Sequence, residues 1–216
     1  MNKDLTSRLL AYVFENSARN DPGSVIDAID GYRRSHGGMI HLGAEKGEVF
    51  DQIVARSGAR RVLELGTNCG YSAIRLTRSL DPAATIRTIE IDRHLSEVAT
   101  ALTAYAGLKG QVEVIHGQAD RIIPRFTLPF DLVFIDHYPE NYLGDLRSIE
   151  RLGLLHEGSI VVSDNVVIFE HQLTSYLDHL RRGGGYESTL HQPAPGYDGI
   201  EASVRRGAVA LAGRMA

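Results

Sequence analysis

The segment from Arg61 to Arg75 (Arg-Val-Leu-Glu-Leu-Gly-Thr-Asn-Cys-Gly-Tyr-Ser-Ala-Ile-Arg) restricts the possible folds of this chain more than any other segment. It begins with a short, mostly apolar run that ends at a glycine, which predicts a buried strand and not a helix. Gly66 and Gly70 then bracket a tight turn, and helical spacing begins at Tyr71. A strand, a glycine turn and a helix in this order bring backbone N–H groups and the positive end of a helix dipole close to a ligand.

The spacing of the two glycines narrows the class of ligand. It is Gly-x-x-x-Gly, whereas dinucleotide sites have Gly-x-Gly-x-x-Gly. The difference favours a smaller, zwitterionic nucleoside over a pyrophosphate. The glycines alone are equally compatible with an ordinary βα turn of a parallel sheet, so the residues at the other strand ends have to decide between the two interpretations.

The rest of the chain alternates strands and helices after a helical beginning. Residues 1–58 predict a helical cover, with helices at 4–18, 24–36 and 44–57 and a short exposed or lid-like segment at 39–42. Residues 60–216 predict a cofactor-binding α/β core, with strands at 62–65, 85–91, 112–116, 132–135 and 159–162 and helices at 71–80, 95–106, 119–125 and 141–152. Such alternation is typical of a parallel, doubly wound sheet with right-handed crossovers.

The end of the chain follows a different pattern. A helix is expected at 170–181, and two strands at 186–191 and 199–205 joined by a turn at 193–196. A terminal hairpin implies an antiparallel strand added at the edge of the sheet. We therefore expect one α/β domain over residues 1–216 with a doubly wound, mostly parallel, seven-stranded sheet.

Composition excludes several classes of protein. The chain has 216 residues and a net charge of −4, which is typical of a soluble globular enzyme or binding domain. It has no long basic run, no apolar stretch long enough to span a membrane and no visible signal peptide, so neither a nucleic-acid nor a membrane partner is expected. Cys69 is the only cysteine, which excludes an internal disulfide and a Cys/His metal site and fits a reducing cytoplasm.

Ligands of doubly wound sheets bind at the carboxyl ends of the strands. Glu90 lies near the end of the second predicted strand, where an acid can accept both hydroxyls of an adenosine ribose, although it could instead be a turn or cap acid. Asp120 follows the third strand and could accept a hydrogen bond from an adenine amino group, but a helix N-cap is at least as compatible with its position.

Two further strand ends carry oxygen ligands. Asp136 follows the fourth predicted strand, and Asp164 and Asn165 follow the fifth. Each could singly be a turn or cap residue, but together they predict a Mg²⁺ site, since Mg²⁺ prefers hard oxygen donors and keeps its other positions for water or substrate. On the last strand Glu201 shares a face with Ser203, opposite to Ile200, and an acid on such a face is usually solvated.

Taken together, these residues resemble the catechol O-methyltransferases, which depend on S-adenosylmethionine and Mg²⁺ and have the Rossmann-like fold of class I methyltransferases. The similarity extends from about Val25 to Arg205. It is carried by segments at consistent spacing, namely Ala28–Tyr32, Gly43–Gly47, Leu63–Ser72, Ile89–Ile91, Asp136-His137, Asp164–Val166 and Asp198–Glu201. The glycine motif marks only the methyltransferase class, whereas the metal trio with Glu201 is far more specific.

The resemblance implies a role for each matching position. Leu42 (by its backbone) and Ser72 would hold the methionine carboxylate, Gly66 and Asp136 the amino group, Glu90 the ribose, and Ile91, Ala119, Asp120 and His137 the adenine, with Glu64 also counted as cofactor-binding. Asp136, Asp164 and Asn165 would ligate Mg²⁺, and Glu201 would accept a hydrogen bond from a substrate hydroxyl, which makes Asp136, Asn165 and Glu201 the catalytic candidates. The expected substrate is a catechol-type small molecule, and the expected assembly a monomer or homodimer.

The sequence also departs from the family pattern. The family's general-base lysine corresponds to Pro139, which cannot take a proton, and the aromatic clamp over the catechol ring is altered at Gly38, Tyr138 and Phe169. Two alternatives to an active catechol enzyme therefore remain. One is a methyltransferase-fold protein that binds S-adenosylmethionine in a regulatory role with weak or lost catalysis, and the other is an O-methyltransferase that acts on a different vicinal-hydroxyl substrate.

Overall fold

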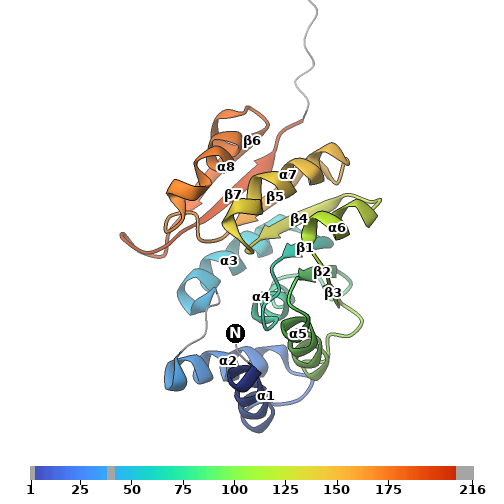
Figure 1. Cartoon of the computed structure of the whole chain (residues 1–216), viewed down its shortest axis with the longest axis vertical. Coiled ribbons are helices and arrows are strands. Elements are labelled where there is room, and N and C mark those ends of the chain that lie inside the picture. Colours follow the sequence, from blue (N-terminus) through green and yellow to red (C-terminus); the bar gives the residue numbers. More distant parts are fainter. Residues whose placement is uncertain (1–2, 38–41, 208–216) are drawn as a thin grey trace, which may run out of the picture.

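A computed structural model describes residues 3–37 and 42–207 of the chain (Figure 1). Its centre is a seven-stranded sheet with the strand order β3-β2-β1-β4-β5-β7-β6. The strands are β1 (Arg61–Leu65), β2 (Thr85–Glu90), β3 (Val112–His116), β4 (Phe130–Ile135), β5 (Leu155–Ser163), β6 (Tyr186–His191) and β7 (Ile200–Arg205). The order reverses between β1 and β4, which is the position where doubly wound sheets bind their ligands.

The direction of the strands confirms the predicted mixed sheet. The strands from β1 to β5 pair in parallel, whereas β7 runs antiparallel to both β5 and β6. The antiparallel strand β7 therefore lies one place in from the edge, and β6 forms the edge itself. The central strands are apolar because both of their faces are covered: every residue of β1 after Arg61 is buried.

Helices cover both faces of the sheet. They are α1 (Lys3–Asn16), α2 (Pro22–His36), α3 (Gly43–Ser57), α4 (Tyr71–Leu76), α5 (Arg93–Tyr105), α6 (Ala119–Ile122), α7 (Tyr142–Arg151) and α8 (Glu170–Arg182), with short 3₁₀ turns η1 (Ile123–Arg125) and η2 (Pro139–Asn141). Two predicted helices are shorter than expected. The helix predicted at 71–80 ends at Leu76, and the one predicted at 119–125 changes to 3₁₀ at Ile123, where Pro124 lacks the N–H that an α-helix needs.

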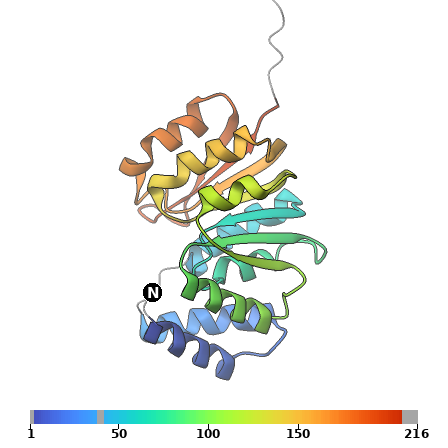
Figure 2. The same ribbon diagram turned by 45° about the vertical axis from the view of Figure 1, so that its right-hand side comes forward.

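Alternate residues of each central strand enter two separate cores. Val62 and Phe134 face α3, α4 and α5, and the ring of Phe134 lies 4.5 Å from that of Phe50. Leu63 and Val133 point the other way, into the core formed with α7 and α8. Helices α1 and α2 pack outside α4 and α5 as a further layer (Figures 1 and 2). No helix among the described residues is long and apolar enough to cross a membrane.

The loops at the switch point approach each other closely at Gly66. Its φ angle is +100°, and a Cβ atom there would lie 2.3 Å from the carbonyl oxygen of Asp136. Backbone hydrogen bonds hold both segments, from Gly66 N–H to Ile89 and from Asp136 N–H to Leu65, so neither can move aside freely. This position therefore requires glycine both for its backbone conformation and for its space.

We expect Gly66→Ala to lower the free energy of unfolding by about 3 kcal/mol, because left-handed strain and overpacking each cost about 1–3 kcal/mol. Gly144→Ala in α7 is the matched control. A Cβ atom at Gly144 meets nothing within 4 Å, so the helix propensity of alanine should leave stability unchanged or raise it by up to about 1 kcal/mol. Urea denaturation of the two variants measures both effects, and equal stabilities would contradict the close approach.

Candidate functional site

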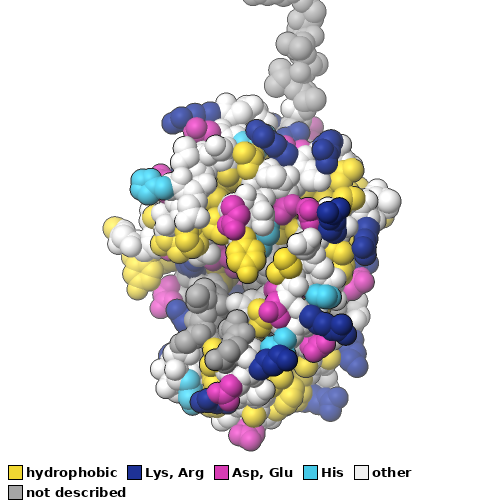
Figure 3. Space-filling view, in the orientation of Figure 1, with side chains coloured by type: hydrophobic (Ala, Val, Ile, Leu, Met, Phe, Trp, Pro, Cys, Tyr) yellow, Lys and Arg dark blue, Asp and Glu magenta, His cyan; other side chains and the backbone are white. Residues whose placement is uncertain are grey.

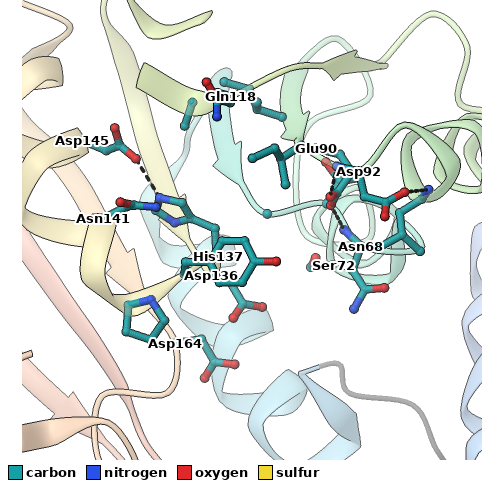
Figure 4. A pocket seen from close by; sticks show the side chains of 18 of the residues that line it. Asn68, Ser72, Glu90, Asp92, Gln118, Asp136, His137, Asn141, Asp145 and Asp164 are labelled. Carbon is teal, nitrogen blue, oxygen red and sulfur yellow. Dashed lines mark hydrogen bonds and ion pairs between the residues drawn. The ribbon is translucent and has the colours of Figure 1, made fainter. Parts of the chain in front are cut away.

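A cavity of about 640 Å³ opens at the carboxyl ends of β1, β2, β4 and β5 (Figure 4). Most residues singled out from the sequence line it, namely Leu42, Gly66, Ser72, Glu90, Ile91, Ala119, Asp120, Asp136, His137, Asp164 and Asn165. Except for Leu42, which precedes α3, they end or follow strands that are far apart along the chain, and they converge because those strands are parallel. Glu64 and Glu201 are not among the lining residues. Gly38 and residues 39–41 of the predicted lid-like segment lie outside the described residues.

Glu90 is held by the backbone of two neighbouring turns. Its carboxylate accepts hydrogen bonds from the N–H groups of Asn68 (2.7 Å) and Asp92 (2.9 Å). Burial raises the pKa of Glu90 above its usual value, and these N–H groups oppose the rise by stabilising the anion. Asn68 itself adopts a positive φ of 51°, which an asparagine tolerates better than most residues. The turn after β1 thus fixes Glu90 in one orientation at the cavity wall (Figure 4).

His137 occupies the opposite side of the cavity and is oriented by two neighbours. Its Nε2 lies 2.7 Å from a carboxylate oxygen of Asp145 (Figure 4). Its ring stacks on Tyr142 at 5.3 Å with an interplanar angle of 8°. Its buried Nδ1 has no hydrogen-bond partner among the described residues. The sequence analysis selected His137 but neither Asp145 nor Tyr142, since their contribution arises only when α7 packs beside the loop after β4.

Asp120 does not cap a helix. The N-cap of α6 is Gln118, and Asp120 lies in the first turn with an exposed side chain near Arg121. The N-cap alternative for Asp120 is therefore wrong, because the helix begins two residues earlier than that alternative requires. Asp120 borders the cavity together with Ala119, on the rim formed by the loop after β3.

The acidic residues of the predicted metal trio meet at the ends of β4 and β5. Burial and the neighbouring Asp164 carboxylate both raise the pKa of Asp136 well above its usual value. No described residue donates a hydrogen bond to the Asp136 side chain. Asn165 adopts a positive φ of 60°, and its side-chain N–H group donates to Asp198 (2.8 Å), so its amide oxygen is left for another partner.

A lysine that the sequence analysis assigned no role completes this cluster. The ammonium group of Lys46 on α3 lies 2.7 Å and 2.9 Å from the two carboxylate oxygens of Asp164, and 2.6 Å from Asp198. Among the described residues, no group of three His, Cys, Asp or Glu side chains is arranged to hold a metal ion. The site instead consists of the carboxylates of Asp136 and Asp164, the amide of Asn165 and the ammonium group of Lys46, which neutralises part of the acidic charge.

Glu201 lies away from the cavity. Arg181 on α8 binds both of its carboxylate oxygens, at 2.7 Å and 2.8 Å, and the Glu201 side chain is 1% exposed. The alternation along β7 explains this orientation, since Ile200 packs into the core under α3 while Glu201 points to the other face of the sheet. The expectation of a solvated acid is wrong, because α8 covers that face. The structure does not bring Glu201 to the other candidate residues.

Glu64 lies beneath the cavity floor. It is completely buried, and burial raises its pKa to about 7, against the opposing effect of the Ser72 and Thr88 hydroxyl groups. Thr88 donates a short hydrogen bond to one carboxylate oxygen, and the other oxygen has no partner among the described residues. Charge on Glu64 is therefore poorly compensated.

Comparisons with known proteins agree with this geometry. A model of the O-methyltransferase family matches residues 29–180. The chain is 36% identical to catechol O-methyltransferase B of Danio rerio, over 91% of this chain and 77% of that protein. It is 32% identical to the catechol O-methyltransferase of Bos taurus, over 96% of this chain and 79% of that one. An O-methyltransferase of Streptomyces achromogenes involved in tomaymycin synthesis, solved in complex with SAM, superimposes with a TM-score of 0.70 at 28% identity, covering 82% of this chain and 87% of that one.

The raised pKa of Glu64 predicts a specific pH dependence of stability. Its folded pKa of about 7 exceeds the usual 4.5, so the folded state holds this proton more tightly and loses stability as the pH rises from about 4.5 to 7. The loss at pH 8 is on the order of 3 kcal/mol. Glu64→Gln should therefore flatten the pH dependence and be more stable than wild type at pH 8, but not at pH 4.5.

Denaturant unfolding at several pH values measures this effect. Glu113→Gln is the control, since it removes one exposed carboxylate on β3 that pairs only with Arg87 across the sheet surface. The control should follow the wild-type pH dependence. Parallel curves for wild type and Glu64→Gln would contradict the assignment of a raised pKa to Glu64.

Proposed function

The chain belongs to the O-methyltransferase family and is an S-adenosylmethionine-dependent enzyme of the catechol O-methyltransferase type, and from this premise we propose that it methylates a hydroxyl of a catechol-type small molecule chelated to Mg²⁺. One observation supports the proposal most strongly: the loops after β4 and β5 bring Asp136, Asp164 and Asn165 to the same cavity as the glycine turn after β1. The cavity thus has room for a cofactor and an acceptor side by side.

The cofactor half of the cavity has a group for each part of S-adenosylmethionine, which supplies a methyl group carried on a sulfonium. We assign the methionine end to the Leu42 backbone, Gly66, Ser72 and Asp136. Glu90 would accept hydrogen bonds from the ribose, since two backbone N–H groups already fix its carboxylate. Ile91, Ala119, Asp120 and His137 would surround the adenine. Glu64 does not line the cavity, and its proposed contribution is indirect: its carboxylate would hold the hydroxyl groups of Ser72 and Thr88.

The chemistry of the donor set fits Mg²⁺. Mg²⁺ is commonly bound by one or two carboxylates and keeps several waters, so it needs no cage of three acids. Asp136 and Asp164 supply the carboxylates, Asn165 has a free amide oxygen, and the Lys46 ammonium already lies against both oxygens of Asp164 as a cation would. Bound there, Mg²⁺ would favour the ionised form of a phenol whose usual pKa is ~10.

The acceptor half has other side chains than the family's aromatic clamp. Tyr138, Pro139 and Phe169 line it, and the Tyr138 side chain is largely exposed. Pro139 offers no base, and the neighbouring Glu140 is exposed and does not line the cavity. The chain would therefore orient the acceptor and stabilise its anion without removing the proton through a dedicated side chain at this position. Another vicinal-hydroxyl substrate is the second candidate, because Tyr138 and Phe169 replace the clamp residues of the family pattern.

The proposal predicts that Asp164→Asn lowers methylation of catechol by about 100-fold or more, because even groups that only support a metal ligand change activity by about 10–100-fold. Affinity for S-adenosylmethionine should change less than about threefold, since Asp164 is assigned to the metal alone. The measurement is transfer of a labelled methyl group to a panel of catechols, with cofactor affinity determined by calorimetry.

Asp178→Asn is the matched control for this experiment, because Asp178 is half-exposed, forms an ion pair with exposed Arg182 on α8 and does not line the cavity. It should retain wild-type activity. An excess of chelator should abolish methylation by wild type, and full activity in chelator would refute the Mg²⁺ assignment while leaving the family unaffected.

Pro139 predicts the shape of the pH–rate profile. Without a base at this position, the rate should keep rising toward alkaline pH as more catechol ionises, and acidic nitro-substituted catechols should lose this dependence. Pro139→Lys should raise the rate near neutral pH by about tenfold, below the 10²–10⁴-fold typical of an optimised base. Pro82→Lys, in an exposed turn far along the chain, is the control for the added charge. A flat wild-type profile at neutral pH, with Pro139→Lys no faster, would mean that another residue is the base.

A further inference from the structure

Lys46 contacts the proposed metal site from helix α3. It projects from the first turn of α3 and binds both carboxylate oxygens of Asp164, at 2.7 Å and 2.9 Å. The side chains of Asp164 and Lys46 are 2% and 13% exposed, so water solvates this pair poorly. A buried carboxylate without a counter-charge is strongly destabilising, and Lys46 supplies that charge in the metal-free chain.

The same ammonium group has a second anion. Asp198, in the loop before β7, lies 2.6 Å from the Lys46 nitrogen. The Asp198 carboxylate is fixed independently of Lys46, by the Asn165 side chain (2.8 Å) and by the backbone N–H groups of Val167 (3.3 Å) and Ile168 (3.2 Å). Asp198 can therefore keep Lys46 paired even when the lysine no longer contacts Asp164.

The position of Lys46 decides which carboxylates are left for a metal ion. Asp136, Asp164 and Asp198 carry three negative charges when ionised, and Lys46 carries one positive charge. Pairing Lys46 with Asp198 alone leaves two carboxylates, whose charge matches that of one divalent cation. If Lys46 instead stayed between Asp164 and Asp198, its ammonium group would compete with the metal for the oxygens of Asp164.

We propose that Lys46 is an internal cation that holds Asp164 in the metal-free protein and withdraws to Asp198 when a divalent cation binds. Lys46 and Asp198 then act as positioning residues that set the affinity for the metal. This inference rests on the proposed metal site at Asp136, Asp164 and Asn165, and it adds two residues to which no role was assigned above.

Mn²⁺ binding to the full-length, cofactor-free protein tests the proposal, with free Mn²⁺ followed by electron paramagnetic resonance. Lys46→Met should bind Mn²⁺ about tenfold more tightly than wild type, within the range usual for coupling between two binding events. Without metal, Lys46→Met should melt about 5 °C lower, because Asp164 loses its counter-charge, and Mn²⁺ should restore more stability to it than to wild type. Lys109→Met removes an exposed lysine elsewhere and should change neither quantity.

A double-mutant cycle separates withdrawal of Lys46 from a simple effect of charge. Asp198→Asn removes the second anion, so Lys46 should stay on Asp164 and Mn²⁺ affinity should fall about tenfold. In the Lys46→Met background the same change should matter less than about threefold, since no lysine is left to redirect. Equal weakening in both backgrounds would mean that Asp198 acts by its charge alone, and the inference would be overturned.

Asp164→Asn distinguishes failure of this inference from failure of the proposed function. If Mn²⁺ binds wild type, is lost in Asp164→Asn and binds Lys46→Met with unchanged affinity, the metal site stands and the role of Lys46 is refuted. If Mn²⁺ binds neither wild type nor Lys46→Met, both are refuted. Binding to Lys46→Met but not to wild type would mean that Lys46 blocks the site and does not withdraw, and the inference would be overturned.

Discussion

The close approach of two loops at the switch point of the sheet is the constraint on which the site depends. Gly66 lies so near the backbone of Asp136 that a Cβ atom would fall 2.3 Å from the Asp136 carbonyl oxygen. This contact joins the turn that bears the cofactor-binding groups to the loop that bears the first acid. Because Asp136 is placed by its backbone, its carboxylate can face the cavity without a hydrogen bond from any described residue.

The second constraint is the accumulation of negative charge. Burial raises the pKa of Asp136, Asp164 and Glu90, and nearby acids raise it further. A single lysine partly neutralises Asp164 and Asp198. The cavity is therefore suited to positively charged partners, and both proposed occupants are of this kind: a sulfonium cofactor and a divalent cation. The face seen in Figure 3 bears interspersed basic and acidic side chains, in contrast to the acidic lining of the cavity.

Some elements could be predicted because their signals are local. The predicted ends of strand β3 agree with the observed ones, and those of β1 and β7 differ by one residue. For β1 the reason is a short apolar run that ends at a glycine, which identifies a buried strand. The predicted strand β5 is four residues too short at its start. Three of the residues Leu155–Gly158 are not apolar, and of the four only Leu155 is in register with a residue of β4. The early end of α4 at Leu76 was missed, since the residues after it keep helical spacing.

The sequence by itself determined the fold class, the glycine turn and the acids at the strand ends. Parallel strands end at one edge of a sheet, so the convergence of Asp136 with Asp164 follows from their positions. Only the tertiary structure decided which cation neutralises these acids and where Glu201 points. Lys46 and Asp164 are 118 residues apart in sequence, and Arg181 approaches Glu201 from a helix on the other face. Ion pairs of this kind leave no periodic pattern, because they form only after packing has fixed which side chains are buried together.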